Sequence, residues 1–254
     1  MNWFELASSL ASREILLFAL CAALIGMAKA GVKGMGMLAV PILASVFGGK
    51  ASAGIMLPLL TFADIFAIAY YNRHSNWEYI IKLMPSAMIG VLLGVWVGAL
   101  INDDTFKILM GILIVIGLGL MIFLEWKALP ARVTTSWWFA SVFGALGGFS
   151  TMIGNAAGPV MAVYLLSTRI SKNEFIGTGA WFFALINIFK WPFHVFVWKT
   201  ISWPTFGLDV LGIPAIALGV WLGVVIIKRI NEKTFRYFII GMTFLIALRL
   251  IFGA

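Results

Sequence analysis

The sequence predicts an all-α membrane protein, a polytopic helical bundle of two inverted repeats. Of the 254 residues, 62% are hydrophobic and 11% are charged, against about 45–50% and about 25% in soluble domains. The apolar residues gather into runs of about 14 to 25, which is the range of buried and membrane helices. Since the runs are apolar on every side and do not alternate, they exclude the strands of a β-barrel.

The first repeat, residues 15–124, follows a short N-terminal segment, residues 1–14, in which we expect no cleaved signal peptide. Its five runs are Ile15–Ala30, Met35–Gly48, Ala51–Tyr71, Tyr79–Ile101 and Phe106–Leu124. As helices the first two would rise about 21 to 24 Å, against a hydrocarbon core of about 30 Å. Gly31, Gly34, Gly36 and Pro41 would break a single longer helix. We therefore expect a broken or re-entrant helix pair followed by three full spans.

The second repeat, residues 136–254, follows a polar linker, residues 125–135, and has the same form. Its runs are Trp137–Ser150, Ile153–Ser167, Phe175–Val197, Phe206–Ile227 and Phe235–Phe252. Gly26, Gly36 and Pro41 match Gly144, Gly154 and Pro159 at a constant separation of 118 residues. The segments 94–98 (GVWVG) and 219–223 (GVWLG) also match. Because each pair returns to the side where it began and three spans follow, the two halves should be inverted relative to each other.

The charge distribution fits a membrane protein. Lys and Arg number 18 against 10 Asp and Glu, a net charge of +8, and loop cations of this kind set membrane topology, so we expect no nucleic-acid partner. The cations gather on one side of the predicted topology, which the positive-inside rule identifies as the cytoplasmic side. Both termini then lie on the outer side of the cytoplasmic (inner) membrane. Cys21 is the only cysteine, which excludes disulfides within the chain and Cys-rich metal sites. We expect no cofactor and no metal, and the oligomeric state stays open, a homodimer included.

Matched, interrupted segments in two halves are the best sequence indication of a transporter's binding site near the membrane midplane. A helix that restarts after a break presents unpaired N–H groups and about half a positive charge, which suit an anion. The candidate substrate-binding residues at the breaks are Lys29, Lys33, Gly34, Gly36, Ser150, Thr151, Gly154 and Asn155. The alternative is that the glycines only allow close helix packing and that the lysines extend to an interface.

Further polar residues lie inside the third run of each half. Asp64 is near the middle of its run, where an unpaired charge is costly; it is as suited to accept a proton that drives transport as to bond neighbouring helices. Asn187, Lys190 and His194 share one helix face in the corresponding run. We expect Lys190 to pair with Asp64 or to meet substrate, and His194 to be interfacial.

The glycine-rich breaks, Val40-Pro41, the segment 50–54 (KASAG) with Asp64 downstream, and Gly158-Pro159 resemble the TauE/SafE family of sulfite exporters and related permeases. The resemblance extends from about residue 15 to 252. It implies a multi-pass inner-membrane carrier of sulfite, of sulfonates such as sulfoacetate or sulfolactate, or of related sulfur compounds. It also places the family's glycine-rich segments on residues 31–36 and 147–158 and its buried acid on Asp64. The lysines of the first break depart from the small residues expected there.

The function predicted from the sequence is secondary transport, in the export direction, of a small sulfur-containing anion by proton-coupled alternating access. A permease for a different solute is an alternative. A divalent cation is disfavoured as that solute, because its site would need several carboxylates within the membrane and Asp64 is the one that we identify. A non-transporting intramembrane enzyme or scaffold is another alternative. We predict that the chain is not an enzyme, because we identify no metal cluster, no paired membrane aspartates and no Ser-His arrangement.

Overall fold

The computed structural model describes residues 12–30, 32, 34–71, 75–126, 136–168, 170–229 and 232–253. The first half contains α2 (Ser12–Lys29), α3 (Met35–Phe47), α4 (Gly49–Tyr71), α5 (Trp77–Leu100) and α6 (Asp103–Trp126). The second half contains α8 (Trp137–Gly154), α9 (Gly158–Ser167), α10 (Lys172–Pro192), the π-helix η2 (Phe193–Val197), α11 (Trp203–Leu211), α12 (Ile213–Arg229) and α13 (Glu232–Phe252). Every regular element in these ranges is a helix, which confirms the all-α prediction.

Four helical segments in the described part of the chain are long and apolar enough to cross a membrane. They are Gly49–Ala69, Trp77–Leu100, Glu174–Val197 and Trp203–Val225. Met35–Phe47 and Ile240–Phe252 are shorter apolar helices. Large side chains such as Trp96, Trp221 and Leu245 are more than half exposed on the outside of the bundle, where lipid would cover them. The molecule is therefore built as a multi-pass membrane protein.

The second break differs from the predicted one. The helix α8 continues through Ser150 and Thr151 to Gly154, so the break is confined to residues 155–157 and α9 begins five residues later than expected. Asn155 ends α8 in the left-handed conformation, with φ of 48°. Its N–H donates to Thr151 O (3.1 Å), the bond of the αL type of helix end. The next N–H, of Ala156, donates to Ser150 O (3.2 Å).

Two other runs are subdivided. The predicted run Phe206–Ile227 forms α11 and α12, which meet at Gly212; Pro214 lacks an N–H and cannot continue the hydrogen bonds of α11. The end of the preceding run is η2, where Trp198 N–H donates to Phe193 O at 2.8 Å. Such wide helical turns often occur at functional sites.

Glycines bring the two halves into close reciprocal contact. In one contact, between α5 and α8, a Cβ at Gly90 would lie 2.1 Å from Ala145 O and one at Gly148 would lie 1.9 Å from Ala87 O. In the other, between α12 and α2, a Cβ at Gly26 would lie 2.2 Å from Ile216 O. A helix from the fourth predicted run of each half, α5 or α12, thus packs on the first helix of the other half. Gly26 and Gly148 thus lie within α2 and α8, outside the breaks, where they allow close helix packing.

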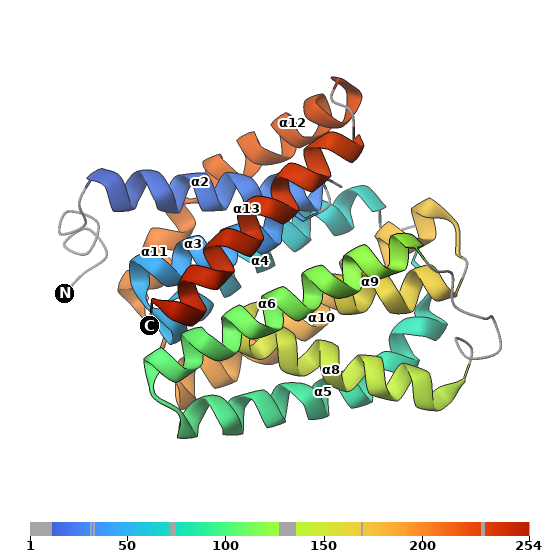
Figure 1. Cartoon of the computed structure of the whole chain (residues 1–254), viewed down its shortest axis with the longest axis horizontal. Helices are drawn as coiled ribbons and strands as arrows, with labels where there is room; N and C mark the ends of the chain where they lie inside the picture. The colour runs from blue at the N-terminus through green and yellow to red at the C-terminus, as the bar shows by residue number, and fades with distance from the viewer. Residues whose placement is uncertain are drawn as a thin grey trace.

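The two broken pairs enter the bundle from opposite ends. Figure 1 shows α2 beginning and α3 ending at the left, and α8 beginning and α9 ending at the right. The end of α2 and the start of α3, and the end of α8 and the start of α9, therefore lie inside the bundle and not at its surface ends. Lys29, in the last turn of α2, is placed within the molecule by this arrangement.

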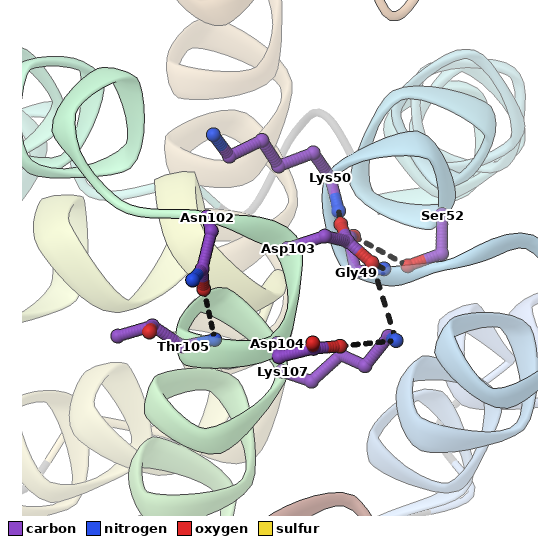
Figure 2. Close-up of polar contacts among 8 residues, drawn as sticks. All are labelled: Gly49, Lys50, Ser52, Asn102, Asp103, Asp104, Thr105 and Lys107. Atoms are coloured by element: carbon purple, nitrogen blue, oxygen red, sulfur yellow. Dashed lines mark hydrogen bonds and ion pairs between the residues drawn. The ribbon is translucent and has the colours of Figure 1, made fainter. Parts of the chain in front are cut away.

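Asp103 fixes one end of the bundle, where the turn between α3 and α4 meets the start of α6 (Figure 2). Its carboxylate accepts hydrogen bonds from the N–H groups of Gly49 (3.0 Å) and Lys50 (2.9 Å). It also pairs with Lys107 at 3.3 Å. Asp103 precedes the apolar part of α6, which begins at Phe106. Burial raises the pKa of the Asp103 carboxyl, but the two N–H bonds and Lys107 outweigh burial, so its pKa lies below the ordinary value.

Replacing Asp103 with alanine should destabilise the fold by about 0.5–2 kcal/mol, the range for loss of a helix cap. Because the pKa is depressed in the folded state, this contribution is fully present above the unfolded value of about 3.9 and is lost as the pH falls through the folded value. Thermal unfolding in detergent should therefore separate D103A from the wild type near neutral pH and bring them together in acid below about pH 4. D104A, which removes a more exposed carboxylate whose one partner among the described residues is Lys107, is the control and should shift unfolding less. An equal shift for both variants would contradict the capping role.

Replacing Gly148 with alanine should lower the midpoint of thermal unfolding, because the new methyl group would overlap the Ala87 carbonyl oxygen. The matched control is Gly119→Ala in α6, where no atom lies within 4 Å of the added Cβ. That change should be neutral or stabilising by about 0.5–1 kcal/mol, since alanine is the better helix former. Equal midpoints for the two variants would refute the close contact between α5 and α8.

Candidate functional site

Lys29 and Asp64 form an ion pair in the interior of the bundle. Lys29 is in the last turn of α2, and Asp64 lies in the middle of α4 with 1% of its surface exposed. The Lys29 ammonium donates to one carboxylate oxygen of Asp64. The Asn187 side-chain amide of α10 donates to the other at 2.7 Å. Both oxygens of this membrane carboxylate therefore have partners, as burial of its charge requires.

Lys190 is one turn beyond Asn187 on the same face of α10, and its side chain is fully buried. Its ammonium donates to Asn155 Oδ1 (2.5 Å), Thr151 Oγ1 (3.3 Å) and Asn187 Oδ1 (3.4 Å). All three acceptors are neutral. Among the described residues, no carboxylate lies within ion-pair distance of Lys190. Two lysines and one aspartate thus leave the cluster with one positive charge in excess when all three are ionised.

Neighbouring aromatic residues hold α10 in this register. The Trp191 indole N–H donates to Thr61 Oγ1 of α4 at 3.1 Å, and the Lys29 ammonium lies 4.9 Å from the centre of the Phe183 ring, within cation–π range. The start of α10 is fixed by a capping box: the Ser171 side chain accepts from the Glu174 N–H, and the Glu174 side chain accepts from the Ser171 N–H. These contacts come from different helices, so the position of the lysines depends on the whole bundle.

The starts of the two restarted helices, α3 and α9, converge on α6. A Cβ at Gly117 would lie 3.2 Å from Pro159 Cγ and 3.3 Å from Met37 Cε, and these residues belong to the first turns of α9 and α3. Gly34 begins α3 in the left-handed conformation, with φ of 89°, which glycine adopts readily. Beside Gly158, at the start of α9, there is open space for 4 Å around an added Cβ.

The structure gathers some of the predicted residues and separates others. Lys29, Asp64, Thr151, Asn155, Asn187 and Lys190 form one hydrogen-bonded cluster, defined here as the charged cluster. Of the two expectations for Lys190, pairing with Asp64 is wrong, because Lys29 takes that position. Ser150 and Gly154 are at the end of α8, and among the described residues no side-chain hydrogen bond joins Ser150 to the cluster. Gly36 is in the first turn of α3, and Lys33 and Gly31 lie outside the described residues.

His194 is buried and not interfacial, so that prediction is wrong. The residue is 0% exposed. Its ring contacts the ring of Trp198 at the end of η2 and lies beside Thr200 of the following loop. The Nδ1 atom lies 2.8 Å from Thr200 Oγ1, whereas Nε2 has no hydrogen-bond partner in the described part of the chain. The position near the end of an apolar run suggested exposure, but the run continues as a wider helix into packed surroundings.

Sequence reasoning also missed Asp209. We identified Asp64 as the one membrane carboxylate, yet Asp209 of α11 is 0% exposed and lies inside the candidate span Trp203–Val225. The same signal, an acidic residue within an apolar run, marks both positions. Thr61, which binds Trp191, gave no comparable signal, because a threonine in a membrane helix usually bonds its own backbone.

The fold and the charged cluster define a multi-pass membrane protein with a buried cationic site at two broken helices, as expected of a membrane transporter. A family model described as "Sulfite exporter TauE/SafE" matches residues 17–250. The chain belongs to the TauE/SafE family, which confirms the resemblance found in the sequence. Membership implies a membrane transporter of sulfite-like anions. No curated protein and no solved structure matched the chain in the corresponding comparisons.

Proposed function

We propose that this protein is a secondary transporter that exports a small sulfur-containing anion, such as sulfite or an organosulfonate, across the inner membrane. The observation that carries the proposal is the fully buried Lys190 ammonium, whose partners are neutral oxygens. A buried charge without an opposite charge is costly. A small oxyanion beside Lys190 would supply the missing charge, and its oxygens would accept hydrogen bonds from the ammonium and the Thr151 hydroxyl.

The anion would bind between the two restarted helices. The starts of α3 and α9 converge at Gly117, and the positive ends of two helix dipoles favour an anion there. The open space beside Gly158 supports a ligand position next to the first turn of α9. Asn155 links this space to the charged cluster, because it lies three residues before Gly158 and accepts the hydrogen bond from Lys190.

Transport would proceed by alternating access of two inverted halves. The reciprocal packing of α5 on α8 and of α12 on α2 is the arrangement that a two-fold relation between repeats would produce. Asp64 and Asn187, which bond each other, are separated by 123 residues, as are Gly54 and Gly177. These residues would lie near the axis that relates the halves. A site at such an axis can be opened to either side by movements of similar extent.

Asp64 would couple transport to protons by controlling Lys29. While Asp64 is ionised, it neutralises Lys29 and the charged cluster matches a monoanion. If Asp64 takes a proton, the ion pair is lost and Lys29 becomes available, so the cluster then matches a dianion. The charge of the bound substrate and the protonation of Asp64 would be linked in this way.

The test of the site is flux of radiolabelled sulfite and of a sulfonate through proteoliposomes. Lys190→Gln should reduce the initial rate at limiting substrate at least about tenfold, since a hydrogen bond to a charged group contributes about 1.5–3 kcal/mol. Lys82→Gln, which removes a partly exposed lysine paired with Glu78, should transport like the wild type. Absence of flux for every sulfur anion in the wild type would reject the substrate, and wild-type rates for K190Q would reject the site.

Asp64→Asn should weaken the coupling of anion flux to the proton gradient. The amide retains the hydrogen bond that Asn187 donates but cannot take up a proton, so flux should persist while an imposed pH difference drives less accumulation of sulfite. The measurement compares sulfite counterflow, which needs no driving force, with gradient-driven accumulation. If D64N accumulates sulfite as the wild type does, Asp64 has no coupling role.

A further inference from the structure

Asp209 is a second acidic side chain inside the membrane part of the molecule. It is the seventh residue of the candidate span Trp203–Val225, so it lies about 9 Å along the helix from the start of that span. The residue is 0% exposed, and neither oxygen of its carboxyl group has a hydrogen-bond partner among the described residues. Asp64 is buried to the same degree but has a partner at each oxygen.

The surroundings of Asp209 are apolar. Its helix α11 packs against α4 and α12, and one turn further on Gly212 lies against Leu59 of α4 and Phe18 of α2. Phe206 of α11 contacts the rings of Phe62 and Trp191. The charged and titratable groups on the described parts of these neighbouring helices are Lys50 and Asp64 on α4, Arg13, Glu14, Cys21 and Lys29 on α2, Glu174 and Lys190 on α10, and His194 on η2. None of them forms a hydrogen bond or ion pair with the Asp209 carboxyl.

An ionised carboxylate in this position would have no compensating charge and no donor. Its burial would cost several kcal/mol, whereas the protonated acid is neutral and costs far less. Asp209 therefore holds a proton in this conformation. A leucine would fill the position without that cost, and the carboxyl forms no hydrogen bond among the described residues that would stabilise the fold. The property that distinguishes it from leucine here is that it can bind and release a proton.

We propose that Asp209 is a second proton-binding residue of the transport cycle and moves one proton for each anion carried. When α11 parts from α4 and water reaches the carboxyl on one side, the acid O–H bond breaks and the proton passes to water. The carboxylate then takes a proton from water when the site opens to the other side. No other bond changes in either step. The coupling role rests on the transport function proposed above, but the protonation of Asp209 does not.

The first test is infrared spectroscopy of the protein in membranes at neutral pH. Among the described acids, Asp64 and Asp209 are the buried ones, and exposed carboxyls are ionised under these conditions. The wild type should show a carboxylic-acid carbonyl band that is absent from Asp209→Leu and retained in Asp64→Asn. A band that persists in D209L, or no band in the wild type, would overturn the protonation of Asp209. This measurement is independent of the substrate.

The second test counts protons and anions in the same proteoliposomes, with a pH-sensitive dye inside and radiolabelled sulfite. In D209L the number of protons moved for each sulfite should fall by one, while counterflow of sulfite continues. Asp209→Asn serves if D209L does not fold, and Val210→Leu, on the half-exposed neighbouring position, is the control that should keep the wild-type ratio. An unchanged ratio in D209L, or a wild type that moves sulfite without protons, would overturn the coupling role. Absence of sulfite flux in the wild type would instead reject the proposed function and leave the infrared result to decide the state of Asp209.

Discussion

The arrangement of the bundle depends on how it accommodates three ionisable side chains away from water. Lys29, Asp64 and Lys190 come from α2, α4 and α10, and Asn187 links them by donating to Asp64 and accepting from Lys190. In a hydrocarbon environment each charge must find its partners within the protein. Helices that carry these residues can therefore pack in few relative positions, because a shift of one turn would leave a buried ammonium or carboxylate without its hydrogen-bond partners.

Close helix contacts place the charged cluster at the correct depth. Gly148 and Gly90 let the backbones of α8 and α5 touch, so α8 extends far enough into the bundle for Thr151 and Asn155 to reach Lys190. Membrane helices gain little from apolar contact alone and associate through close packing and polar contacts. The glycines and the charged cluster are thus complementary: the glycines set the distance between the halves, and the polar contacts set their register.

The sequence predicted the helices well and the partners within the site only in part. Run lengths, the two short pairs and the depths of Asp64 and Lys190 follow from hydropathy, which is a local property. Which lysine pairs with Asp64 is a property of three-dimensional packing, and Lys29 could not be preferred over Lys190 without it. The extension of α8 was missed because Gly147 and Gly148 suggest a break, although in the fold α5 lies against Gly148 and Val160 of α9 lies beside Gly147. His194 was misjudged for a similar reason, since run position does not reveal a neighbouring loop.

A duplication of the chain would explain why the charged cluster is asymmetric. If Asp64 and Asn187, which are 123 residues apart, are equivalent positions of two repeats, one position carries an acid and the other its neutral isostere. Two acids there would repel each other and cancel both lysines. The amide at Asn187 instead donates to Asp64 and accepts from Lys190, and one positive charge is left over. The first half thus contributes an ion pair, and the second contributes neutral amide and hydroxyl groups and a lysine that has no counter-ion among the described residues. This division of roles would give a duplicated scaffold a site that selects the sign of its substrate.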